Sequence, residues 1–255
     1  MKYFILTGTS RGIGEALAEQ LLDENHHLLC ISRTANQQLI EHANAINCRL
    51  DYFPFDLSHV NGIDGLIEAV FEVIHSAVPQ AEVEAIYLIN NAGMLAPVAP
   101  IELSSAEQMT ENVHINLLAP MIMSSNFIKR THNMNVDKRI MNISSASAKY
   151  LLPSQSCYST AKSGLDTFSK SVSLEQQGKT YPVKVASVYP GMIDTDMQAQ
   201  IRSASKENFP FVDQFVQIAE EGKLQTPEYT ARKLLDLLFS ENFGDTAVVE
   251  TLGQG

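Results

Sequence analysis

Short apolar runs alternate along the chain with longer stretches in which apolar residues recur at helical spacing. Most of the short runs are continuously apolar, which is typical of parallel strands that are covered on both faces. This pattern predicts seven strands, at residues 2–7, 27–32, 48–55, 85–90, 138–144, 183–189 and 246–252. The stretches between them predict six helices, at residues 12–25, 36–45, 61–77, 104–131, 156–177 and 226–240.

The alternation predicts an α/β fold with a doubly wound (Rossmann) parallel sheet and helices on both faces. No Pro/Gly/Ser linker, internal repeat or charge block interrupts residues 1–255, so we expect a single domain. Asn61 and Thr226 are expected to cap helices, and Pro227 suits a first helical position. Residues 192–225 follow the sixth strand, at the edge where such folds bind ligands, and are expected to form a substrate lid.

Charge and composition limit the possible partners. The formal net charge is -11, and an acidic surface repels nucleic acid and anionic membranes, so neither is expected as a partner. No apolar run approaches the roughly 18 residues of a membrane span, and the first one is too short for a signal peptide. The three cysteines lack metal-like spacing, which predicts buried free thiols, no metal site and a cytoplasmic protein.

A glycine-rich turn, TGTSRGIG, joins the first predicted strand to the first helix. Glycines allow a tight turn and close backbone approach, and the helix N-terminus offers free N–H groups to a pyrophosphate. A strand–helix turn without a ligand is the alternative that this motif alone leaves open. The turn supplies six expected dinucleotide contacts: Gly8, Ser10, Arg11, Gly12, Ile13 and Gly14.

Small and polar residues also end three later strands. They are NNAG at residues 90–93, the two serines at 144–145, and PGMIDT at residues 190–195. Each is ordinary alone, but all fall at the carboxyl edge of the predicted sheet, where the strands end. Their coincidence favours a binding site at that edge.

Tyr158 and Lys162 lie in the stretch CYSTAKSG, and their spacing puts both side chains on one helix face. An ammonium favours phenolate, so we expect Lys162 to lower the pKa of Tyr158 from about 10. Tyr158 could then protonate a carbonyl oxygen that Ser145 also hydrogen-bonds. The alternative is a hydrated helix face without catalytic chemistry.

Taken together, these motifs and Asn116 resemble the short-chain dehydrogenase/reductase family, in order and over essentially the whole chain. The resemblance implies the strand order 3-2-1-4-5-6-7 and carbonyl/alcohol redox chemistry with a nicotinamide cofactor. It implies that Lys162 also holds the nicotinamide ribose and that Asn116 supports a water relay to Lys162. Helices 104–131 and 156–177 commonly form a subunit interface in this family, so a homodimer or homotetramer is expected. The implied catalytic residues are Asn116, Ser145, Tyr158 and Lys162, and the further cofactor contacts are Arg33, Asp56, Asn91, Ala92, Gly93, Tyr158, Lys162, Pro190, Gly191, Ile193 and Thr195.

The end of the second predicted strand bears on the choice of cofactor. Sites that prefer NAD usually carry an acid there, but this chain has Ser32 followed by Arg33. Arg11 lies in the glycine-rich turn, and two guanidinium groups that converge on one ribose suit a 2′-phosphate. We therefore expect NADP(H), with two solvated surface arginines as the alternative interpretation.

Residues 190–240 resemble the family branch that contains sepiapterin reductases and bacterial benzil reductases. An apolar, adaptable lid formed by Met192, Met197, Phe209 and Phe211 would suit aromatic ketones, with plain loop packing as the alternative. The small-molecule substrate is expected to contact Ser145, Tyr158, Gly191, Met192 and Met197.

An NADPH-dependent reductase of one carbonyl of a 1,2-diketone is the favoured function, and two alternatives stay open. A sepiapterin-type reductase would need an acid near the C-terminus, where the predicted last strand places Leu252-Gly253. A non-catalytic NADP(H)-sensing protein on this fold is expected to lose part of the catalytic set, but all of that set is present.

Overall fold

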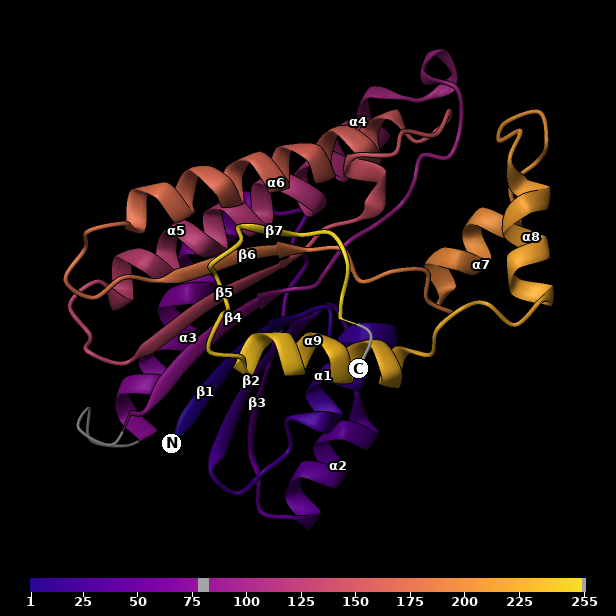
Figure 1. Cartoon of the computed structure of the whole chain (residues 1–255). Coiled ribbons are helices and arrows are strands. Elements are labelled where there is room, and N and C mark those ends of the chain that lie inside the picture. Colours follow the sequence, from indigo (N-terminus) through magenta and orange to yellow (C-terminus); the bar gives the residue numbers. More distant parts are fainter. Residues whose placement is uncertain (78–82, 254–255) are drawn as a thin grey trace.

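The computed structural model describes residues 1–77 and 83–253. Its core is a parallel sheet of seven strands in the order β3-β2-β1-β4-β5-β6-β7, which confirms the predicted fold (Figure 1). The last strand is shorter than predicted. The strands are β1 (Lys2–Thr7), β2 (His26–Ser32), β3 (Arg49–Pro54), β4 (Ala85–Asn90), β5 (Asp137–Ile143), β6 (Lys184–Val188) and β7 (Val248–Val249).

Helices cover both faces of the sheet (Figure 1). One face packs against α1 (Gly12–Gln20), α2 (Gln37–Ala45) and α9 (Pro227–Phe239). The other packs against α3 (Ile63–Ala77), α5 (Ala119–Thr131) and α6 (Ser156–Gln176). Successive side chains of a strand enter opposite cores, as Phe4 and Ile5 of β1 do, so both must be apolar.

The predicted helix at 104–131 is broken into three parts. The helix α4 (Ala106–Val113) leads into one wide π-helical turn, η4 (His114–Leu118), and then into α5. Such π turns insert a residue into a helix and often occur at functional sites. Apolar periodicity continues through the turn, so it does not reveal the break.

Of the two predicted caps, one is confirmed. Thr226 accepts a hydrogen bond from the backbone N–H of Tyr229 at 3.2 Å and caps α9, whose first residue is Pro227. Asn61 is not a cap. It lies inside a 3₁₀ turn, η1 (Val60–Gly62), that runs directly into α3. Two other 3₁₀ turns, η3 (Ile101–Leu103) and η5 (Ala146–Ala148), lie in the loops after β4 and β5.

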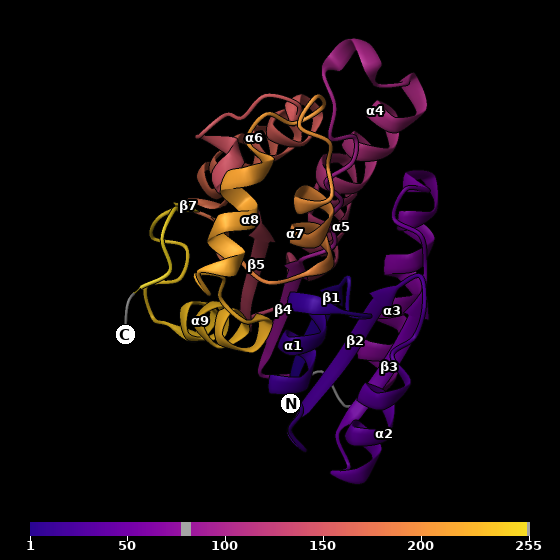
Figure 2. The same cartoon turned by 90° about the vertical axis from the view of Figure 1, so that its right-hand side faces the viewer.

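The segment 192–225 contains two short helices, α7 (Asp196–Arg202) and α8 (Val212–Glu220), which the sequence pattern did not predict. They lie beyond the carboxyl ends of the strands (Figures 1 and 2). The two ends of this segment lie side by side. The Gln225 carbonyl oxygen accepts a hydrogen bond from the Asp194 N–H, and the Gln225 backbone N–H donates to the Met192 carbonyl oxygen, both at 2.9 Å. We propose that this segment is the substrate lid.

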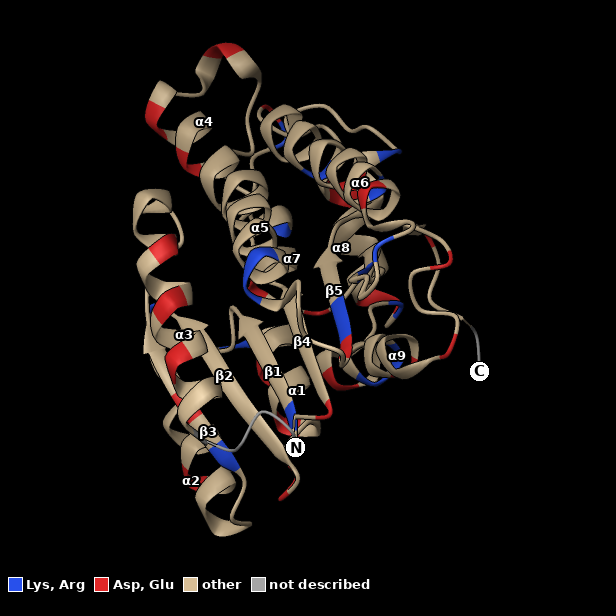
Figure 3. Ribbon diagram, turned by 90° about the vertical axis from the view of Figure 1, so that its left-hand side faces the viewer, with Lys and Arg blue, Asp and Glu red and all other residues tan. Residues whose placement is uncertain are grey.

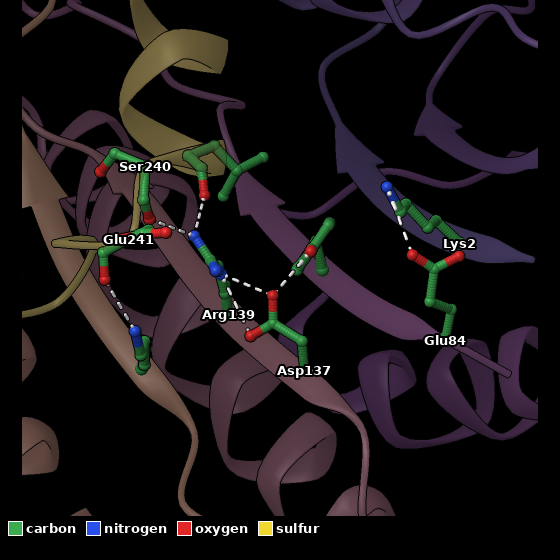
Figure 4. A network of polar contacts seen from close by, with 9 residues as sticks. Lys2, Glu84, Asp137, Arg139, Ser240 and Glu241 are labelled. Carbon is green, nitrogen blue, oxygen red and sulfur yellow. Dashed lines mark hydrogen bonds and ion pairs between the residues drawn. The ribbon is translucent and has the colours of Figure 1, made fainter.

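Arg139 of β5 joins the sheet to the end of α9 (Figure 4). Its guanidinium donates to the Asp137 carboxylate at 2.8 Å and to the carbonyl oxygens of Leu238 and Ser240 at 2.5 and 2.7 Å. Lys138 and Arg139 are the second and third residues of β5, near its amino end. Acidic residues are spaced along α3 and α4 (Figure 3). This network lies at the sheet edge opposite to the predicted site.

Membrane-spanning helices and metal-binding clusters are both absent from the described part of the chain. No helix there is both long and apolar enough to cross a membrane. Residues 1–77 and 83–253 also contain no cluster of His, Cys, Asp and Glu that could hold a metal ion. The cysteines are free, but Cys157 is half-exposed and not buried as expected.

Candidate active site

The glycine-rich turn has the geometry of a phosphate-binding loop. Gly8 and Gly12 have φ angles of +74° and +60°, which favour glycine. A Cβ at Gly14 would lie 2.1 Å from the Gly8 carbonyl oxygen, so no larger residue fits there. Arg11, at the N-cap of α1, makes no side-chain cap, and the first N–H groups of the helix are therefore available to an anion. The turn fits the pyrophosphate of a dinucleotide.

The ends of β1, β4 and β6 meet beside this turn. The Thr7 hydroxyl oxygen accepts hydrogen bonds from the N–H groups of Asn91 and Ala92, both at 3.0 Å. The Asn91 amide donates back to the Thr7 carbonyl at 3.0 Å. From the segment after β6, the Thr195 methyl lies 3.6 Å from the place of a Cβ at Gly12. The structure thus brings the TGTSRGIG, NNAG and PGMIDT stretches together, as predicted.

Neutral hydroxyl groups occupy the end of β2. The Tyr52 hydroxyl lies 2.8 Å from the hydroxyl oxygens of both Thr9 and Ser32, and Ser32 donates to the Thr34 carbonyl at 2.7 Å. The place where NAD sites usually carry an acid is therefore uncharged. Tyr52 is a candidate site residue that the sequence analysis missed, because a tyrosine within a strand is also an ordinary core residue.

The two arginines near this place interact with different carboxylates. Arg11 donates to Asp196 of α7 at 2.8 Å, and both side chains are about seven-tenths exposed. The positive charge of Arg33 influences Asp56. Burial raises the pKa of Asp56, but hydrogen bonds from Ser58 and the charge of Arg33 outweigh burial, so the pKa lies below its usual range. The structure thus shows an Arg11–Asp196 ion pair that the sequence did not predict.

Tyr158 and Lys162 lie side by side on α6, as their spacing predicts. They are 7% and 4% exposed, and the Lys162 ammonium lies 5.6 Å from the centre of the Tyr158 ring. Lys162 donates to the carbonyl oxygen of Ile143, the last residue of β5, at 2.8 Å. Ser145 is half-buried just before η5, and its hydroxyl acts to lower the pKa of the Tyr158 phenol. The predicted serine, tyrosine and lysine therefore form one cluster.

The expected lowering of the Tyr158 pKa is wrong for this structure. Burial raises the pKa of the phenol, because enclosed phenolate loses its hydration, and the Ser145 hydrogen bond only partly opposes this. Burial also lowers the pKa of Lys162 to about 8, against the opposing charge of Asp166. Tyr158 therefore keeps its proton at neutral pH, as a proton donor in a reduction must.

Asn116 lies in the π turn, and its side chain is fully engaged. Its amide accepts from the Met94 N–H at 3.1 Å and donates to the Met94 carbonyl at 2.8 Å and to Asn112 at 3.0 Å. A Cβ at Gly93 would lie 3.1 Å from the Asn116 side-chain oxygen and 3.6 Å from the Lys162 nitrogen. Asn116, Gly93 and Lys162 thus lie close together, and Asn112 is a further contact that the sequence did not predict.

The expected substrate contacts from the lid segment differ in exposure. Gly191, with a φ of +96°, and Met192 are exposed, and Met197 is half-buried. Phe209 is fully buried, and its ring packs 5.5 Å from that of Phe215 within the same segment. For Phe209, the loop-packing interpretation therefore holds.

The chain belongs to the short-chain dehydrogenase family, whose family model ("short chain dehydrogenase") matches residues 2–206. It is 44% identical over 249 residues to the benzil reductase ((S)-benzoin forming) of Bacillus cereus, with 98% of each chain covered. Identity to the enzyme of the same description from Bacillus subtilis (strain 168) is 34% over 238 residues, with 93% of each covered.

More distant likenesses agree with this family. The sepiapterin reductase of Xenopus tropicalis is 26% identical over 251 residues, which cover 94% of this chain and 92% of that protein. The crystal structure of the KRED1-Pglu enzyme superposes with a TM-score of 0.81 at 24% identity, and the match covers 98% of this chain and 100% of that one. At that identity the superposition shows the fold alone.

Proposed function

We propose that the protein is an NADP(H)-dependent carbonyl reductase that converts one carbonyl of an apolar 1,2-diketone to a chiral hydroxyketone. The observation that carries the proposal is the cluster of a protonated, buried Tyr158 with Ser145 and the Lys162 ammonium at the carboxyl edge of the sheet. The 44% identity to a benzil reductase supports the choice of substrate.

The bound cofactor would supply the hydride, and the N-terminus of α1 and the glycine-rich turn would hold its pyrophosphate. Ser145 donates a hydrogen bond to the carbonyl oxygen and fixes its position. Tyr158 gives its phenolic proton to the same oxygen as the carbon is reduced. The Lys162 ammonium stabilises the phenolate that remains, and it is available to the ribose hydroxyls.

The proposed preference for NADPH rests on the uncharged end of β2 and the exposed Arg33 beside it. We expect the double substitution of Ser32→Asp and Arg33→Ala to favour NADH, because it adds a repulsive carboxylate and removes a phosphate partner. A charge-assisted hydrogen bond contributes about 1.5–3 kcal/mol, so the NADPH dissociation constant should rise at least about tenfold. Fluorescence titration with both cofactors measures this, and equal affinity of the native protein for NADH and NADPH would contradict it.

With benzil and NADPH, we expect one enantiomer of the hydroxyketone to accumulate and the diol to form slowly. After one reduction the product must rotate to present its second carbonyl, and the lid segment that closes over the site resists this rotation. Chiral chromatography of the products decides the matter. A racemate or rapid formation of the diol would contradict the proposed lid and substrate, and no NADPH oxidation with any carbonyl would favour the sensor alternative.

A sepiapterin-type reduction is the second candidate, and one observation favours it. The predicted last strand places Leu252-Gly253 where that reaction needs an acid, but β7 ends earlier, and Glu250 follows it directly. Its carboxylate binds the Lys149 ammonium at 2.6 Å, in the loop that carries Ser145. Faster reduction of sepiapterin than of any simple diketone would make this the function.

A further inference from the structure

Asp166 is a buried carboxylate that has no role in the proposed reaction described above. It lies on α6, one helical turn after Lys162, and is 6% exposed. Its two oxygens each accept a hydrogen bond of 2.6 Å. One comes from the hydroxyl of Ser187 in β6, and the other from the hydroxyl of Tyr189, which follows that strand. Within residues 1–77 and 83–253, it makes no ion pair shorter than 4.0 Å.

A buried charge of this kind needs compensation. Removing a carboxylate from water is unfavourable unless donors and an opposite charge replace its hydration. Ser187 and Tyr189 provide the donors, with one hydrogen bond to each carboxylate oxygen of Asp166. Lys162 provides a buried ammonium on the same helix. Because both groups are shielded from solvent, salt screens their attraction much less than at the surface.

We propose that Asp166 is a positioning residue that keeps Lys162 in its ammonium form, and that the hydrogen bonds from Ser187 and Tyr189 offset the cost of burying its carboxylate. The inference rests on the proposed function only for the importance of the Lys162 charge in the reduction. Without Asp166, burial alone would favour the neutral amine, which stabilises a phenolate less than an ammonium does.

The other charged and titratable groups around α6 do not replace Asp166. The opposing influences on the pKa of Lys162 are burial and the charge of Asp166. On α6 itself the other group nearest to Lys162 along the helix face is Tyr158. The groups on neighbouring elements are Tyr189 after β6, Lys149 and Tyr150 after η5, Glu250 after β7, Glu107 and Glu111 on α4, His114 in η4, and Lys129 and Arg130 on α5. Of the carboxylates among them, Glu250 is paired with Lys149, and both acids of α4 are exposed.

The decisive measurement is the pKa of Lys162 in the cofactor-free protein, followed by NMR of isotope-labelled lysine side chains and assigned with Lys162→Met. For the wild-type protein we expect this measurement to give a Lys162 pKa of about 8, lowered by burial. In Asp166→Asn, which keeps the shape but removes the charge, we expect this pKa to fall by about one unit. The alkaline decline of the reduction rate, which follows loss of the Lys162 proton, should move to lower pH by the same amount.

Tyr189→Phe is the matched control, because it removes one hydrogen bond to Asp166 and leaves the carboxylate charge in place. Its Lys162 pKa should stay near the wild-type value even if its stability falls. If Asp166→Asn does not fold, Asp166→Ser tests the same loss of charge with a smaller side chain.

Two results would overturn the inference: an unchanged Lys162 pKa in the uncharged variants, or an equal fall in Tyr189→Phe. The NMR measurement does not depend on turnover. If Lys162 responds as expected but no carbonyl is reduced, only the proposed function fails. If benzil is reduced but Lys162 does not respond, only the role of Asp166 fails.

Discussion

Replacement of Tyr158 by Phe is expected to lower kcat for carbonyl reduction by a factor of about 10²–10⁴, the usual contribution of a positioned general acid. The ring, which is 7% exposed and lies beside the Lys162 ammonium, stays in place, so only the proton donor is lost. NADPH affinity should therefore change by less than about threefold, well below the loss of a charge-assisted contact. Steady-state rates and a fluorescence titration with NADPH measure the two effects separately.

Tyr150→Phe is the matched control for this variant. Tyr150 lies in the loop between β5 and α6 and is 63% exposed, so removal of its hydroxyl should leave kcat close to that of the native enzyme. Substantial turnover by the Tyr158 variant, or an equal loss in both variants, would show that Tyr158 is not the acid.

Gly14→Ala is expected to abolish detectable NADPH binding and to lower the free energy of unfolding by about 3 kcal/mol or more. The added Cβ would lie 2.1 Å from the Gly8 carbonyl oxygen and 2.5 Å from the Asn91 side-chain nitrogen. Both neighbours belong to the turn and loop that form the site, so relief of the clash must open the phosphate-binding turn. Chemical denaturation and a binding titration test the two parts of this expectation.

Gly65→Ala provides a control within a helix. A Cβ at Gly65 of α3 meets no atom within 4 Å. Alanine favours a helix over glycine by about 1 kcal/mol, so this variant should be as stable as the native protein or more stable, with unchanged NADPH affinity. A Gly14→Ala variant that binds NADPH as the native protein does would mean that the turn does not need its close backbone approach.

Much of the candidate site could be predicted because its residues belong to short stretches at strand ends. Continuous apolar runs mark strands buried on both faces, and the ends of parallel strands meet at one edge. TGTSRGIG, NNAG and PGMIDT therefore had to lie near one another once the strand order was known. Helical spacing likewise placed Tyr158 and Lys162 on one face of α6.

Contacts between residues far apart in the sequence could not be predicted in this way. The Thr9–Tyr52–Ser32 hydroxyl cluster joins the turn after β1 to β2 and β3, and nothing local distinguishes Tyr52 from a core tyrosine. The pairing of Arg11 with Asp196 likewise depends on where α7 lies.

The amino-acid sequence by itself determined the order of the elements, the edge at which the polar motifs gather and the spacing of the tyrosine–lysine pair, because these depend on local periodicity and backbone geometry. Tertiary structure alone decided the protonation of that pair. The pKa of Tyr158 depends on how completely its phenol is enclosed. The charge of Lys162 depends on Asp166, which Ser187 of β6 and Tyr189 just after that strand bind in the protein interior. Burial and long-range hydrogen bonds arise only when separate segments pack together, so no local pattern encodes them.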